Sequence, residues 1–227
     1  MKKLIICLLT LGLLLCGCSQ SPVPEMEAPT ETAAPTEAPK EFSLGTIENN
    51  VYTNAYAGWG CDFGDGWSFA GAEALQQLPE DVQSLVDGSE MSTVLEDYAQ
   101  IFDLAAENVE AYLAVNIVCT AISEAEQALY DSLTEEETID ATLENRDMIL
   151  ESYAQAGMVV ESMEKVEVTF LGQPHFAIRT AAYSGDLPIY MLQVMDYTQG
   201  SYGVTLTATS YLEDNTQQVL EMFYAVK

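Results

Sequence analysis

Basic side chains are scarce in this sequence. Against 36 Asp and Glu, the 227-residue chain has only 7 Lys and Arg and one His, so its formal net charge is −29. Proteins bind nucleic acids and anionic lipid headgroups through Lys and Arg, which neutralise phosphates and release counterions. The composition therefore excludes a nucleic-acid-binding protein and a protein that docks on membranes through a polybasic patch.

Sequence motifs for catalysis are also missing. Any His-containing triad would have to use His175, yet no G-x-S-x-G nucleophile elbow occurs. We therefore expect His175 to be a structural or surface residue, and a single histidine excludes a histidine-rich zinc site. Phosphate-binding loops, dinucleotide fingerprints and EF-hand spacings are absent. Ser162 and Lys165 have the S-x-x-K spacing of penicillin-binding enzymes, but the segment around them predicts a strand and the motif needs the start of a helix.

The N-terminus has the three parts of an export signal. Lys2 and Lys3 precede an apolar run over residues 4–15, which is well short of the ~20 residues that span a bilayer. The segment Leu15-Cys16-Gly17-Cys18 resembles the bacterial lipobox. This resemblance implies that residues 1–17 are a lipoprotein signal peptide and that Cys18 carries a diacylglyceryl group, a stable anchor. The alternative is a secreted protein that is cut near Ser19.

The assignment of a lipoprotein signal accounts for three of the five cysteines. Cys7 and Cys16 would leave with the signal and Cys18 would carry lipid, so Cys61 and Cys119 remain for the mature protein. An even pair in an exported domain is compatible with one disulfide. Two buried free thiols are the other possibility, because unpaired cysteine is often buried.

Residues 18–40 form a segment of unusual composition. It contains five of the eight prolines and no aromatic residue, and it repeats the sequence Ala-Pro-Thr-Glu at residues 28–31 and 34–37. Such a segment cannot bury enough apolar surface to offset its chain entropy, so we expect a disordered tether. Its reach is at most ~70 Å at ~3.1 Å per residue.

Residues 41–227 hold all of the aromatic residues and are long enough for one domain. Their patterns predict an α+β fold, in which an antiparallel sheet carries helices on one face. The clearest helix runs from Thr134, which has capping-box spacing to Glu137, to a stop at Gly157. A second helix is expected to begin near Asn215 and to continue to Val226, and two short ones are expected over residues 71–78 and 80–86. The expected strands cover residues 51–56, 60–63, 96–106, 111–121, 166–170, 176–180, 189–197 and 202–211.

Several of these segments resemble PsbP/Mog1-like domains of bacterial lipoproteins. The resemblance lies in Val51-Tyr52-Thr53-Asn54, Tyr56, Gly58 and Gly66-Trp67, and in Val168-Thr169-Phe170-Leu171-Gly172 and Phe223-Tyr224. It implies an antiparallel sheet flanked by helices, and a role in binding or assembly rather than in catalysis. It carries over no functional residues.

Two groups of residues between positions 52 and 67 could bind something. Asp62-Phe63-Gly64-Asp65-Gly66 is an acidic turn that could hold Ca²⁺ weakly, although solvated aspartates are the simpler interpretation. Tyr52, Tyr56, Trp59 and Trp67 could form an aromatic ligand surface, although the edge of the core is the simpler interpretation.

Together these features predict a lipid-anchored protein on the extracytoplasmic face of a membrane. The domain is expected to be a non-enzymatic binding or accessory module for an envelope or extracellular partner, with no cofactor. The alternatives are a small carboxylate-dependent hydrolase of wall or polysaccharide substrates and a ligand-capture lipoprotein. The 36 acidic residues make some close pair of carboxylates inevitable, so acidity alone does not favour the hydrolase.

Overall fold

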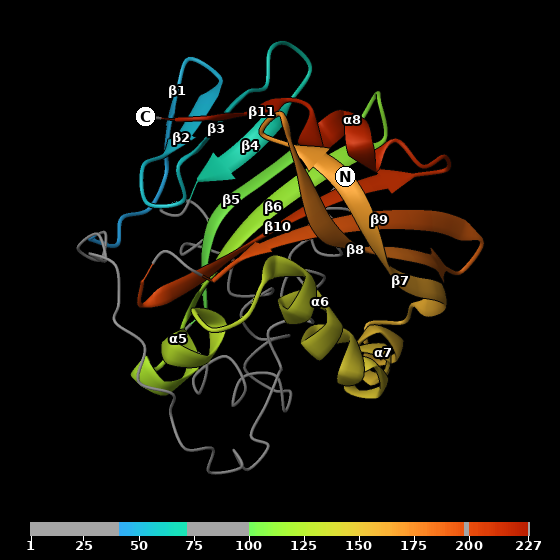
Figure 1. The fold of residues 1–227 in the computed structure, drawn as a ribbon. Helices are drawn as coiled ribbons and strands as arrows, with labels where there is room; N and C mark the ends of the chain where they lie inside the picture. Colours follow the sequence, from blue (N-terminus) through green and yellow to red (C-terminus); the bar gives the residue numbers. More distant parts are fainter. Residues whose placement is uncertain (1–40, 72–99, 198–199, 227) are drawn as a thin grey trace, which may run out of the picture.

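The computed structural model of this chain describes residues 41–71, 100–197 and 200–226. These residues form two antiparallel sheets and four helices (Figure 1). The α+β class and the antiparallel sheet expected from the sequence are therefore confirmed. The predicted signal peptide, Cys18 and the tether lie outside the described residues, as do residues 72–78 and 80–86 of the two short predicted helices. No described helix is long and apolar enough to cross a membrane.

The smaller sheet has four strands in the order β1-β2-β3-β11, and the larger has seven in the order β4-β5-β6-β10-β9-β8-β7. The small-sheet strands are β1 (Thr46–Glu48), β2 (Val51–Asn54), β3 (Trp59–Asp62) and β11 (Phe223–Ala225). The large-sheet strands are β4 (Ser68–Gly71), β5 (Gln100–Asn108), β6 (Leu113–Ala121), β7 (Val159–Phe170), β8 (Gln173–Ser184), β9 (Leu187–Asp196) and β10 (Tyr202–Tyr211). The helices are α5 (Glu124–Tyr130), α6 (Glu135–Glu144), α7 (Arg146–Gln155) and α8 (Thr216–Leu220).

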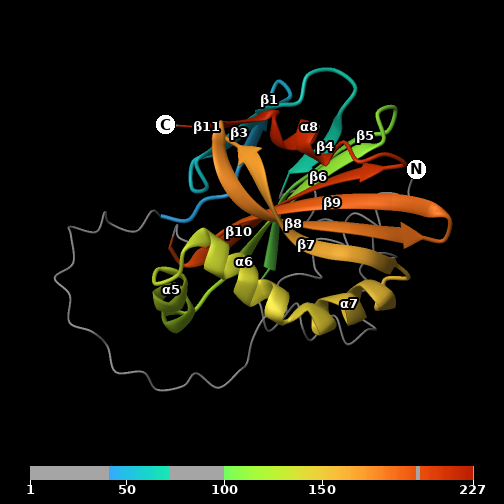
Figure 2. The same cartoon turned by 45° about the vertical axis from the view of Figure 1, so that its right-hand side comes forward.

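Both faces of the large sheet are covered, which corrects the expectation of helices on one face. The small sheet and α8 lie on one side, and α5, α6 and α7 lie on the other (Figure 1 and Figure 2). The first side buries a cluster that includes Tyr52, Phe170 and Leu206. The second side buries a separate cluster that includes Ile139, Tyr153 and Met191. In β6 and β10 one set of alternate residues enters the first cluster, and the other set, which includes Asn116, Thr205 and Thr207, is also buried. Both strands are therefore buried along almost their whole length.

Two helix predictions needed correction. The helix expected over residues 134–157 is two helices, because the chain breaks at Asn145, whose side-chain amide donates to the carbonyl of Ala141 (3.1 Å). Asparagine favours such breaks because its side chain competes for backbone groups. Gly157 does end the second helix, with φ +77°.

The predicted C-terminal helix stops at Leu220, and residues 223–225 form β11 instead. Phe223 pairs with Cys61, so β11 occupies the edge of β3 that would otherwise be unpaired. The four-residue period of Val219 and Phe223 is local, whereas this strand pairing joins residues far apart in the sequence. Tertiary pairing therefore decides the structure of the last residues.

Candidate functional site

A cavity of about 380 Å³ lies at the end of the large sheet where β7, β8 and β9 approach α5 and α6. Its volume falls within the range of small-molecule sites. Four aromatic side chains line it: Trp59, Tyr130, Phe170 and Tyr197. The rings of Tyr130 and Tyr197 are stacked with centroids 4.4 Å apart, and Trp59 meets Phe170 edge-on at 5.2 Å.

The polar side chains of the cavity include a histidine–carboxylate pair. His175 Nδ1 lies 2.8 Å from Oε1 of Glu135, and both side chains are partly exposed, at 29% and 34%. When Nδ1 carries a proton and donates to Glu135, Nε2 is an acceptor in the neutral ring and a second donor in the charged ring. Asp196 and Thr138 line the same cavity. The only histidine of the chain is thus part of this site, which sequence reasoning did not anticipate.

Local structure sets the position of this pair. Glu135 is the first residue of α6, whose predicted capping box is confirmed: the Thr134 hydroxyl accepts from the Glu137 amide (3.2 Å), and the Glu137 carboxylate accepts from the Thr134 amide (2.8 Å). His175 follows the tight turn between β7 and β8. That turn consists of Leu171 and Gly172, with φ values of 51° and 75°. Positive φ at both positions is the geometry of a two-residue hairpin turn, which glycine adopts without strain.

The cavity does not contain an organised nucleophile among its described lining residues. Thr138 is its only aliphatic hydroxyl, and its Oγ1 donates to the backbone carbonyl of Thr134 (3.1 Å). Within the described ranges, no group of three or more His, Cys, Asp and Glu is arranged to hold a metal ion. The pair and the aromatic walls are suited to binding: the rings supply contact area, and the polar groups orient a ligand.

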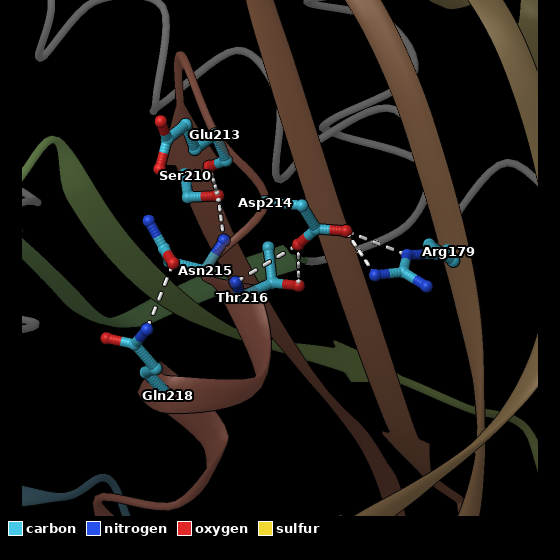
Figure 3. A network of polar contacts seen from close by, with 7 residues as sticks. All are labelled: Arg179, Ser210, Glu213, Asp214, Asn215, Thr216 and Gln218. Atoms are coloured by element: carbon cyan, nitrogen blue, oxygen red, sulfur yellow. Dashed lines mark hydrogen bonds and ion pairs between the residues drawn. The ribbon is translucent and has the colours of Figure 1, made fainter.

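No Lys or Arg is among the described residues that line the cavity, and two of the basic side chains are committed elsewhere. Lys165 lies 2.9 Å from Glu136 and 2.7 Å from Asp140. Its ammonium donates hydrogen bonds to Asp140, the larger cause, and to Glu136, and these bonds raise the pKa of Lys165. Its place in β7 confirms that the S-x-x-K segment is a strand. Arg179 forms an ion pair with Asp214 in the loop before α8, and both its Nε and its Nη2 donate to the Oδ2 atom of that carboxylate (Figure 3).

The Asp214 carboxylate also accepts hydrogen bonds from the hydroxyl and amide of Thr216, and the Ser210 hydroxyl closes the same loop (Figure 3). Partial burial acts to raise the pKa of Asp214, but the bonds from Thr216 and the charge of Arg179 outweigh it and lower that pKa. This network is a brace for the loop, and it leaves Arg179 unavailable to the cavity.

The four aromatic residues that the sequence suggested as a surface do not form one. Tyr52, Tyr56 and Trp59 are buried, with 0%, 1% and 3% exposure, and Trp67 packs half-buried at the margin of the same cluster. Only Trp59 lines the cavity. Burial therefore makes three of them part of the core.

Tyr52 belongs to a buried polar centre that the sequence did not reveal. Asp103, 1% exposed, accepts hydrogen bonds from Gly45 N (2.6 Å), the Tyr52 hydroxyl (2.5 Å) and Asn54 Nδ2 (2.7 Å). Asp103 sits at a register shift in β5, between Phe102 and Leu104, as expected of a bulge that re-aims a side chain. Burial, followed by the negative charge of Asp103, raises the pKa of Tyr52 well above its ordinary value.

The other predicted candidates have plain structural roles. Asp62 is exposed, and its Oδ1 accepts from the amide of Gly64 (3.1 Å), which makes an internal turn bond. Asp65 is exposed in the same turn. Cys61 and Cys119 are both fully buried, and no disulfide joins them. Burial raises the pKa of the Cys61 thiol to about 12, so it is chemically inert at neutral pH.

One signal in the sequence would have located part of the site. Ser123 and Glu126 have capping-box spacing, and they form that box at the start of α5, a helix that the sequence analysis missed. The capping box marks the start of α5, and the last residue of this helix, Tyr130, lines the cavity. Nothing comparable in the sequence brings His175 to Glu135, since the two lie on different elements.

A smaller cavity of about 230 Å³ lies at the turn between β5 and β6. It is lined mainly by apolar side chains, including Val109 and Tyr112, which are 45% and 52% exposed. Its described lining has no histidine–carboxylate pair like that of the larger cavity, so the larger cavity is the stronger candidate.

Comparison with known proteins identifies a fold neighbour and no family. No protein-family model and no curated protein matches the sequence. Among solved structures, the chain is similar to the solution structure of cyanobacterial PsbP (CyanoP) from Synechocystis sp. PCC 6803, with 12% sequence identity and a TM-score of 0.40. The match covers 81% of this chain and 98% of the cyanobacterial one.

Proposed function

We propose that this protein is a binding module, held by a lipid on Cys18 at the extracytoplasmic face of a membrane, and that the cavity beside α6 is its binding site. Its partner is an envelope or extracellular molecule that places one group in the cavity. The observation that carries this proposal is the cavity itself, whose aromatic walls lie around the Glu135–His175 pair and whose described lining holds no organised nucleophile. Aromatic contact area with a few oriented polar groups is the composition of a ligand site.

A cavity-filling variant tests the site. Thr138→Trp places a large ring in the cavity, whereas Thr142→Trp makes the same substitution one turn later on α6, away from the cavity lining. We expect Thr138→Trp alone to lose the molecules that co-purify with, or thermally stabilise, the detergent-extracted protein. Retention of every such molecule by Thr138→Trp would contradict the proposal.

The anchor is tested separately. In cells, Cys18→Ala or an inhibitor of signal peptidase II should leave an uncleaved precursor. The wild-type protein should fractionate with membranes and incorporate labelled fatty acid at Cys18. Unchanged processing in both treatments would show that Cys18 is not the attachment site.

A carboxylate-dependent hydrolase is the second candidate, because Glu135 and Asp196 line one cavity. Glycoside hydrolysis needs two such carboxyl groups, one as an acid and the other as a base or nucleophile. This candidate would be favoured over a binding module by two results together. The protein would release reducing sugar from wall or dietary polysaccharides, and both Glu135→Gln and Asp196→Asn would abolish that activity.

A further inference from the structure

We propose that the cavity accepts an organic cation: an amine or quaternary ammonium group attached to an apolar or aromatic body. This inference rests on the proposed function, since it names the ligand class of the same site. Three properties of the cavity support it: the charge of its lining, its aromatic walls and the charge of the surrounding domain.

The described lining carries a negative charge in either state of its histidine. Glu135 and Asp196 contribute two carboxylates, and His175 is the only basic group. With a neutral imidazole the lining bears two negative charges, and with a charged imidazole it still bears one. A carboxylate ligand would therefore meet repulsion from Asp196, whereas an ammonium group would meet attraction.

The aromatic walls favour the same ligand class. Trp59, Tyr130 and Tyr197 come from three separate segments and line one volume. Trp and Tyr rings attract cations through their electron-rich faces, and this attraction strengthens in a site that excludes water. A neutral aromatic ligand would gain the contact area of the walls but neither of the charge interactions.

Two basic side chains of the domain are not available to a ligand in the cavity. Lys165 and Arg179 are held in ion pairs with Glu136, Asp140 and Asp214, away from the cavity. The whole chain has a net charge of −29, which raises the local concentration of cations near its surface. Long-range attraction and local contacts thus select the same ligand class.

Three probes of similar size and different charge test the inference: benzylammonium, benzyl alcohol and benzoate. The protein is the full-length chain in a non-ionic detergent, carrying Trp67→Phe so that Trp59 in the cavity wall is its only tryptophan. Quenching of Trp59 fluorescence reports binding. We expect the ammonium probe to bind about tenfold more tightly than the alcohol, and benzoate to bind most weakly.

Variants locate the charge effect. Glu135→Gln and Asp196→Asn should each weaken the ammonium probe about three- to tenfold and leave the alcohol unchanged. Glu144→Gln, which removes the same charge from an exposed position on α6, should change neither. Thermal unfolding without probe checks that each variant is folded. If a variant does not fold, the order of affinities of the three probes for the Trp67→Phe protein still tests whether the cavity prefers a cation.

The outcomes separate the two proposals. Equal binding of the alcohol and the ammonium probe, or preference for benzoate, would overturn the cation inference and leave the binding module intact. Absence of quenching by all three probes, together with unchanged ligand retention in Thr138→Trp, would overturn both.

Discussion

Two carboxylates on opposite sides of the large sheet show how tertiary surroundings assign a role to the same chemical group. Asp103 lies under the small sheet, fully buried, and accepts from three donors on separate parts of the chain. Glu135 lies on the helical side, 34% exposed, with the single partner His175 beside a cavity. A fully buried carboxylate that already accepts from three donors is not accessible to a ligand, whereas a partly exposed one at a cavity is. The comparison separates a structural carboxylate from one available for binding.

The largest effect should come from Asp103. Asp103→Ala would leave the amide of Gly45, the Tyr52 hydroxyl and the Asn54 amide group without an acceptor in a buried site. We expect the free energy of unfolding to fall by about 3 kcal/mol or more, because each orphaned buried donor costs ~1–3 kcal/mol. Urea unfolding measures this. Asp65→Ala, at an exposed turn, should change stability by less than about 0.5 kcal/mol. Similar losses of unfolding free energy in Asp103→Ala and Asp65→Ala would contradict a structural role for Asp103.

A smaller effect should come from the cap that sets the start of α6. Thr134→Ala removes the capping hydroxyl and should lower stability by about 1 kcal/mol. The cap also lowers the pKa of Glu137, through the backbone and then the side chain of Thr134. A carboxyl group whose pKa is lower in the folded than in the unfolded protein stabilises the fold at pH values above its unfolded pKa. This contribution to stability is lost as the pH falls through the folded pKa. The difference in the free energy of unfolding between wild type and Thr134→Ala should therefore shrink on acidification. Chemical unfolding between about pH 6 and about pH 3, a range that includes the ordinary pKa of Glu, measures this difference. A difference that is constant across that range would contradict the linkage.

The Glu135–His175 pair should contribute still less to stability. Partly exposed ion pairs are worth about 0–1 kcal/mol, so a double-mutant cycle of Glu135→Ala and His175→Ala should give a coupling free energy within that range. Each alanine removes one partner of the contact between Glu135 Oε1 and His175 Nδ1. A coupling well above the range would place Glu135 with Asp103 among the structural carboxylates.

The smallest effect should appear at the two cysteines. In a chain that begins at Ser19, neither Cys61 nor Cys119 should react with a thiol reagent in the native state, and both should react after denaturation without a reductant. Mass spectrometry of the alkylated chain counts them. A denatured chain with no reactive thiol would show instead that the two cysteines form a disulfide.

Local signals predicted those parts of the fold that depend on neighbouring residues. The capping box at Thr134, the stop at Gly157 and the common face of Val204, Leu206 and Ala208 in β10 each involve a few consecutive positions, and each is present in the structure. The same kind of signal failed for residues 223–225, where pairing with β3 overrode a helical period. It also could not show that Asn145 divides one predicted helix into two.

The sequence by itself determined the charge of the protein, its α+β character and the spacing of its caps, because these depend on composition and on contacts within a few residues. Only the tertiary structure decided which acids are buried, which histidine contact exists and where a cavity opens. Asp103 meets Tyr52 from 51 residues away, and His175 meets Glu135 from 40 residues away. Strand pairing and helix packing bring these groups together, and no local pattern records which distant segments will become neighbours.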